Sequence, residues 1–223
     1  MSTTRLKIYN GALLLVGERG LASLTVTEES RRVLDEVWND NGVRYCLEQG
    51  QWNFAMRAAQ FTYDSTITPS FGLNRGFNKP SDWVLTSAVC SDEYFNTPAL
   101  NYADEAGVWY ADIDDIYVRY VSDDENFGMD MSLWPDTFTE YVKTYFASRI
   151  CHKIPGSPEV IQKLHGPAGH PQRGLLHQAL LLAKNRAAMT GPATFPARGS
   201  WVGSRLGGRR GSFDRGSSGS LTG

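Results

Sequence analysis

Near the N-terminus, apolar residues recur at three- and four-residue steps, as on one face of an amphipathic helix. The pattern predicts a helix over residues 6–16, followed by Gly17 and Gly20 as helix-ending residues. The stripe consists of Leu6, Tyr9, Leu13 and Val16, widened by Ile8, Ala12 and Leu15.

A second helical stripe starts after the segment "LTVTEES" and carries on towards Glu48. Thr25 with Glu28 has the spacing of a capping box, and Thr27 is the alternative cap. Asn41 and Gly42 interrupt the stripe, which predicts a kink there because both residues lower helix propensity.

From Trp52 onward the pattern changes to alternation, and a strand is predicted after Trp52. Residues 64–80 are punctuated by Pro, Gly and Asn, which favours a long loop and a candidate binding loop. Short strands are then expected within residues 82–89, 99–104, 107–112 and 115–121, with a hairpin turned at residues 105–107.

The helical period returns at Pro135, which suits the first position of a helix. The apolar face of this helix is wide, so we expect it to lie at the centre of the core. It consists of Phe138, Tyr141, Val142, Tyr145, Phe146 and Ile150. A short helix capped by Ser157 and opened by Pro158 should follow, and then a last helix over residues 172–189.

This order of elements predicts an α+β fold in which a helical bundle is interrupted by a β-rich subdomain. The expected boundaries are residues 1–51 and 135–190 for the bundle, 52–134 for the β-rich insert, and 191–223 for a flexible Gly/Ser/Arg-rich C-terminal arm. The arm holds too little apolar surface to offset the entropy of ordering it, so we expect it to be disordered in an isolated chain.

Composition agrees with a globular protein: 41% of the 223 residues are hydrophobic, enough for one core or one core with an insert. The apolar run 12–16 is too short to cross a bilayer, so no membrane span, signal peptide or membrane partner is expected. Cys46, Cys90 and Cys151 are odd in number and far apart, which favours reduced, packed thiols in a cytosolic setting.

Charge is distributed unevenly along the chain. The segment 198–223 carries five arginines against Asp214 alone, while 17 of the 22 bases and 23 of the 24 acids lie upstream. A basic arm on an acidic body is typical of an interaction segment. The predicted subunit or partner contacts of this arm are Arg198, Trp201, Arg205, Arg209, Arg210, Phe213 and Arg215.

Thirteen acidic residues lie within residues 82–136, where Arg119 is the single base. Their spacing does not follow the EF-hand pattern, so we expect a solvated acidic surface and no calcium site. Neither His165 with His170 nor His170 with His177 has the spacing of a helical metal site. Surface or capping histidines, no metal and no cofactor are therefore expected.

The sequence also lacks a nucleophile elbow, a phosphate-binding loop and a dinucleotide fingerprint, and no enzymatic activity is expected. Two alternatives stay open. The Arg/Gly/Ser-rich arm is of a type that can bind nucleic acid, although the acidic body opposes it. An enzyme would require a pocket with perturbed ionisable groups.

Two segments carry a resemblance to a known family. "YNGALLLVGERGLASLTVTEESRRVLDEVWNDNGVRYCLEQGQWNFAMR" and the later "WPDTFTEYVKTYFASRI" resemble phage head–tail adaptors of the tail tubular protein A type. The shared features are a helix ending in a Gly–Glu pair (Gly17, Glu18), a Trp-x-Phe (Trp52, Phe54), and a Pro before an aromatic-rich helix leading to Ala147 and Arg149. The resemblance covers about residues 9–150, and the basic arm departs from the family pattern.

The resemblance implies a structural virion protein at the head–tail junction, assembled in the host cytoplasm. It implies a homo-oligomeric ring, expected to be a dodecamer, that binds the portal protein on one side and the downstream tail or nozzle protein on the other. Genomic DNA would meet the ring only in transit.

Overall fold

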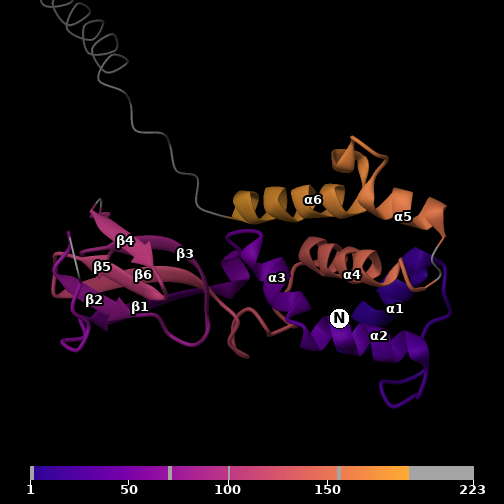
Figure 1. Ribbon diagram of the computed structural model, residues 1–223, viewed down its shortest axis with the longest axis horizontal. Coiled ribbons are helices and arrows are strands. Elements are labelled where there is room, and N and C mark those ends of the chain that lie inside the picture. The colour runs from indigo at the N-terminus through magenta and orange to yellow at the C-terminus, as the bar shows by residue number, and fades with distance from the viewer. Residues whose placement is uncertain (1–2, 70–71, 100, 155–156, 191–223) are drawn as a thin grey trace, which may run out of the picture. The chain divides into compact units, whose positions relative to one another are not determined.

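The chain folds into a helical core and two small antiparallel sheets, a mixed α+β architecture as predicted (Figure 1). The computed structural model describes residues 3–69, 72–99, 101–154 and 157–190. Contacts group residues 1–190 into one unit. None of the helices in this described part is long and apolar enough to cross a membrane.

The first helix confirms the N-terminal prediction. Helix α1 (Arg5–Val16) begins after Thr4, whose hydroxyl accepts a hydrogen bond from the Lys7 amide, and it ends at Gly17 in the left-handed conformation. Glycine adopts this conformation without steric cost, which explains the stop at this point.

The second helix starts later than the capping motifs predicted. Helix α2 (Glu29–Asn39) has Glu28 at its N-cap position and no side-chain cap. The capping prediction at Thr25 or Thr27 is therefore wrong. Instead, the Thr25 hydroxyl lies 2.8 Å from the Ser23 hydroxyl, within the loop.

The interruption at Asn41 and Gly42 is a full break. Asn41 has φ 58° and separates α2 from α3 (Gly42–Glu48). A Cβ at Gly42 would lie 2.6 Å from the Val37 carbonyl oxygen, so the close approach of the two helices requires glycine here.

Helix α4 (Asp136–Ile150) is central, as predicted, and contacts all five other α-helices of the described chain. Figure 1 shows it between α6 (Leu175–Thr190) and the pair α1–α2. Of its expected apolar face, Phe138, Tyr141, Val142, Phe146 and Ile150 are buried and Tyr145 is half-buried. Pro135 occupies the N-cap position and not the predicted first position, so the helix starts one residue later than expected.

The remaining helices are short or begin late. Helix α5 (Pro158–His165) starts with Pro158 after Ser157, as expected. A 3₁₀ turn, η2 (Pro171–Arg173), precedes α6, so the last helix begins at Leu175 and not at Gln172.

The strands form two three-stranded sheets. The first has the order β1 (Met56–Thr62), β6 (Asp115–Ser122), β3 (Trp83–Cys90), and the second the order β2 (Arg75–Asn78), β5 (Val108–Ala111), β4 (Tyr102–Glu105). The predicted hairpin joins β4 to β5, with positive φ angles at Ala106 and Gly107.

Two sequence predictions about this region need correction. The segment after Trp52 first forms a 3₁₀ turn, η1 (Asn53–Ala55), and the strand starts only at Met56. The expected long loop of residues 64–80 contains β2, whose register with β5 pairs Phe77 with Trp109.

Two hydrophobic clusters hold the described chain together, and β6 takes part in both. Ile116, Val118 and Tyr120 face a cluster with Phe77 and Trp109, from the second sheet. Val121, on the opposite face of β6, packs in the cluster built by the helices. The period-two alternation of a strand thus links the two parts of the core.

Candidate assembly interface

Helix α6 has apolar side chains on more than the face that it packs against the core. Leu176, Leu180 and Ala187 pack against the helical cluster, and Ala183 is buried. Leu182 and Met189 nevertheless expose 62% and 77% of their surface, and Leu181 46%. These exposed apolar side chains make α6 a candidate contact surface.

A groove of about 320 Å³ lies beside this helix. Its walls come from η1, from the start of α4 and from the last turns of α6. The lining residues are Trp52, Asn53, Phe54, Leu133, Pro135, Thr137, Phe138, Ala183, Arg186, Ala187 and Thr190.

Hydrogen bonds fix the residues that shape the groove. The Trp52 indole N–H donates to the Leu47 carbonyl at 3.0 Å, and the ring centroid of Trp52 lies 4.8 Å from that of Phe138. The Asn53 side-chain amide donates to the Ala187 carbonyl at 2.9 Å, which ties η1 to α6. The groove is therefore preformed.

The chemistry of the groove is that of a hydrophobic contact. Aromatic rings, Leu133, Pro135 and alanines form most of its walls, and Arg186 brings one exposed guanidinium. Leu133 at the rim exposes 49% of its surface. Such a groove can bury an apolar side chain of a partner while the guanidinium at its side binds a carboxylate.

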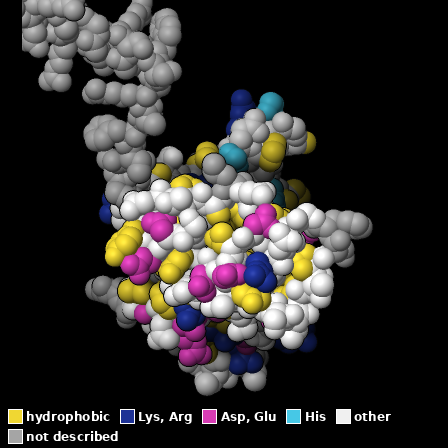
Figure 2. Space-filling model, turned by 90° about the vertical axis from the view of Figure 1, so that its left-hand side faces the viewer, with side chains coloured by type: hydrophobic (Ala, Val, Ile, Leu, Met, Phe, Trp, Pro, Cys, Tyr) yellow, Lys and Arg dark blue, Asp and Glu magenta, His cyan; other side chains and the backbone are white. Residues whose placement is uncertain are grey.

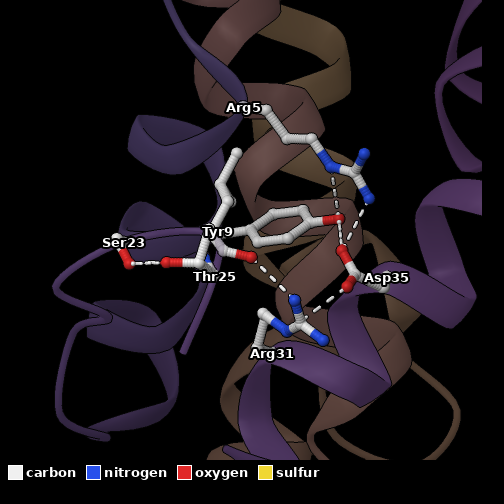
Figure 3. Close-up of polar contacts among 7 residues, drawn as sticks. Arg5, Tyr9, Ser23, Thr25, Arg31 and Asp35 are labelled. Carbon is white, nitrogen blue, oxygen red and sulfur yellow. Dashed lines mark hydrogen bonds and ion pairs between the residues drawn. The ribbon is translucent and has the colours of Figure 1, made fainter. Parts of the chain in front are cut away.

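A polar network joins α1 to α2 elsewhere in the helical core. Figure 3 shows Tyr9 and Arg5 of α1 pointing to Asp35 of α2, with Arg31 on the other oxygen of the same carboxylate. The Tyr9 hydroxyl donates to Asp35 at 2.8 Å, and the Arg5 guanidinium lies 2.6 Å from it. Burial, reinforced by Asp35, raises the pKa of Tyr9 well above its ordinary value. The network keeps Tyr9 neutral and positions the two helices.

None of the thirteen acidic residues between Asp82 and Asp136 is buried. Figure 2 views the end of the molecule that carries the sheets, where Asp and Glu side chains are spread among apolar ones. Many of these carboxylates are used in turns: Asp92 accepts from the amides of Asn96 and Thr97, and Asp130 from the amide and hydroxyl of Ser132. The acids therefore shape loops as well as facing solvent.

Among these carboxylates, Asp82 accepts hydrogen bonds from three different side chains. It accepts hydrogen bonds from Arg57 at 2.9 Å, from the Ser122 hydroxyl at 2.5 Å and from the Tyr120 hydroxyl at 3.2 Å. Burial by itself would raise the pKa of Asp82, but the hydrogen bonds from Ser122 and Arg57 outweigh it and the pKa is lowered. Burial and the Asp82 charge raise the pKa of Tyr120 to about 12.

Lys79 places a buried ammonium group in the β-rich part. Only 6% of its side chain is exposed; its ammonium lies 3.5 Å from the centre of the Trp83 ring and 2.5 Å from the Asp104 carboxylate. The Trp109 indole N–H donates to Thr86 and to Asp104. The lysine is thus an internal link between β2, β3 and the β4–β5 hairpin.

One cysteine and two histidines lie close together in the structure, which their spacing in the sequence did not predict. All three cysteines are free and buried, as expected. Cys151, His152 and His165, however, come together so that one ligand atom from each lies within 4.8 Å of the others. His152 and His165 are surface histidines, as expected, and Nε2 of His165 lies 3.2 Å from the Ser148 carbonyl oxygen, but their approach to Cys151 was not predicted. The adjacent Cys–His pair at a helix end was the available signal.

The predicted contact residues of the arm lie outside the described residues. This applies to Arg198, Trp201, Arg205, Arg209, Arg210, Phe213 and Arg215. The sequence pattern predicted this last helix but not the exposure of Leu181, Leu182 and Met189 on its outer face. Neither a protein-family model nor a curated protein matches this chain.

Proposed function

We propose that the protein is a structural subunit of a phage head–tail junction. In this role it is an adaptor that assembles into a ring, expected to have twelve copies, and joins the portal protein to the next tail component. The ring surrounds the channel through which genomic DNA leaves the capsid. The resemblance of residues 9–150 to head–tail adaptors supports this place in the particle.

The observation that carries the assembly part of the proposal is the exposed apolar face of α6 beside a preformed groove. Leu182 and Met189 protrude from α6, whereas Trp52 and Phe138 line the groove beside the same helix. A contact in which the protruding face of one copy enters the groove of the next is head-to-tail, and such contacts form a closed ring when the rotation from copy to copy closes. Apolar side chains on α6 of one copy would fill the groove of the next.

The test uses the full chain and two variants of α6. Wild-type protein, alone or with its portal protein, should form rings in electron microscopy. Leu182→Lys combined with Met189→Lys should prevent ring formation while circular dichroism stays unchanged, because both side chains are exposed in the subunit. Asn185→Lys adds one positive charge at an exposed polar position of α6, against two in the double variant, and is the control.

Two results would reject the proposal. One is a wild-type protein that stays monomeric at high concentration and in the presence of portal protein. The other is a double variant that assembles like the control. Tight, steeply salt-dependent binding of DNA by the isolated subunit would instead support the nucleic-acid alternative, since release of counterions makes such binding sensitive to salt.

A further inference from the structure

Cys151, His152 and His165 form a compact group at the ends of two helices. Cys151 and His152 follow directly after the last residue of α4, and His165 is the last residue of α5. The Cys151 sulfur lies 3.8 Å from Nε2 of His165, and the two imidazole ring centroids are 5.6 Å apart. Residues 14 positions apart in sequence thus meet.

The backbone holds these side chains in place from both sides. Cys151 is fully buried, and its amide bonds to the Ala147 carbonyl as the cap of α4. Leu164, one residue before His165, is also fully buried in the helical cluster. Gly166 then turns the chain at φ 85°, where a Cβ would lie 2.6 Å from the His170 carbonyl oxygen. His165 is therefore fixed by its neighbours.

The Ser148 carbonyl oxygen lies close to both Cys151 and His165. The Ser148 carbonyl oxygen lies 3.2 Å from the Cys151 sulfur and 3.2 Å from Nε2 of His165. Both side chains thus converge on one point at the end of α4. Convergence of a thiol and an imidazole before binding reduces the cost of ordering ligands around an ion.

We propose that Cys151, His152 and His165 bind a zinc ion as a three-ligand site. Zinc prefers thiolate and imidazole ligands, at about 2.3 Å to sulfur and about 2.0–2.1 Å to nitrogen. In a tetrahedron these bond lengths place sulfur and nitrogen roughly 3.5 Å apart. The 3.8 Å between Cys151 and His165 is close to this value, and the exposed His152 is free to turn inward by the remaining distance.

Binding would exchange one proton for the metal. Zn²⁺ takes the place of the thiol proton of Cys151, which passes to the solvent, and coordinates the lone pair of a nitrogen on each neutral imidazole. The fourth position stays open to water. Lys153, the next charged residue, is paired with Glu29 at 2.8 Å, so its ammonium charge is partly balanced.

A bound zinc ion would attach α5 to α4 more firmly than the packing of α5 does. This helix has eight residues, of which Leu164 alone is buried. Helices of this length are marginal in water without such support. A zinc ion would tie the end of α5 to the end of α4, which is the central helix.

The experiment titrates the untagged full chain, freed of metal, with Zn²⁺ and with Co²⁺. Zinc should bind with a stoichiometry of one and raise the melting temperature. Cobalt should give the visible absorption of a tetrahedral site together with a thiolate-to-cobalt band. His152→Ala, at an exposed position, should keep the fold and weaken zinc binding by about tenfold or more.

Two further variants separate the site from non-specific binding. Cys151→Ser should remove the thiolate band, and His177→Ala, on the exposed side of α6, should bind zinc like the wild type. Equal zinc affinity in the wild type and in His152→Ala, or a cobalt spectrum without a thiolate band, would overturn the proposal. Neither outcome depends on ring assembly, so the proposed function is tested separately.

Discussion

Arg44 of α3 forms an ion pair with Asp123, the residue that follows β6. The same guanidinium donates a hydrogen bond to the Trp83 carbonyl at 2.6 Å. One side chain therefore connects the helices to the ends of β3 and β6. Lysine cannot replace it, because a single ammonium lacks the forked donors that reach both acceptors.

Removal of this link should loosen the attachment of the sheets to the helices. We expect Arg44→Met to lower the free energy of unfolding by roughly 1–3 kcal/mol, since it leaves the partly buried Asp123 carboxylate and the Trp83 carbonyl without their donor. Urea unfolding measures this. Arg32→Met breaks the exposed pair with Glu29 and should change little. Equal effects of the two variants would contradict the role of Arg44.

The ring of Phe146 lies in the helical core, where it contacts the rings of Tyr9 and Trp38. It is fully buried, so Phe146→Ala leaves a cavity and should cost roughly 3–5 kcal/mol. Thermal unfolding checks this value. Leu14→Ala on α1 removes a side chain that is 78% exposed and serves as the control. An unchanged melting temperature in Phe146→Ala would exclude the packing described.

Stability should fall in acid partly through Asp82. Its pKa is lower in the folded protein than in the unfolded chain, where a carboxyl titrates near pH 4. Its contribution is therefore complete above about pH 4 and is lost as the pH falls through the lower folded value. Asp82→Asn should lower stability at pH 7 and flatten the acid dependence. The same slope in both proteins, measured by urea unfolding between pH 2 and 7, would disprove this.

Calcium should leave the protein unchanged. Asp123 is paired with Arg44, Asp124 accepts from the Asn126 amide and Asp130 from Ser132, so these carboxylates already have partners. Addition of Ca²⁺ to metal-free protein should not shift the melting temperature. A shift with Ca²⁺ would contradict the expectation of a solvated acidic surface, whereas a shift confined to Zn²⁺ belongs to the cysteine–histidine group.

Truncation before Arg198 should leave folding intact but weaken the binding of the protein to its neighbours in the particle. The described helices and sheets end at Thr190, so circular dichroism should stay the same. Binding to the portal protein or to the next tail component should weaken, because five arginines are lost, and added salt should weaken the intact complex in the same sense. Normal connectors and infectious particles from the truncated protein would show that the arm is dispensable.

Local patterns predicted those elements that carry their own signals. Helix α4 was predictable because its apolar residues keep a helical period, and the β4–β5 hairpin because Gly107 permits a positive φ angle. Strand β2 was not, since Gly76 and Asn78 disfavour strands locally and only pairing with β5 makes this segment extended.

The candidate sites were predictable to a smaller extent. The exposed face of α6 could not be predicted from the sequence, because Leu180 and Leu181 are equally apolar. Only the packing of the helix shows which of them faces the core. The cysteine–histidine group depends on the turn that brings α5 back to the end of α4. No fixed spacing within one helix encodes it, and Leu164 positions His165 only after the core has formed.

The pairing of α1 with α4 constrains the order in which the chain can fold during synthesis. The buried face of α1, with Ile8 and Leu13, finds its main partner only after Ile150 has been made. At about 5–20 residues per second, that takes roughly 7 to 27 seconds on the ribosome. The sheets, whose strands lie between the two helices, can pair during this interval. The apolar face of α1 therefore stays exposed until α4 has been synthesised. During this time the face is a binding site for a chaperone.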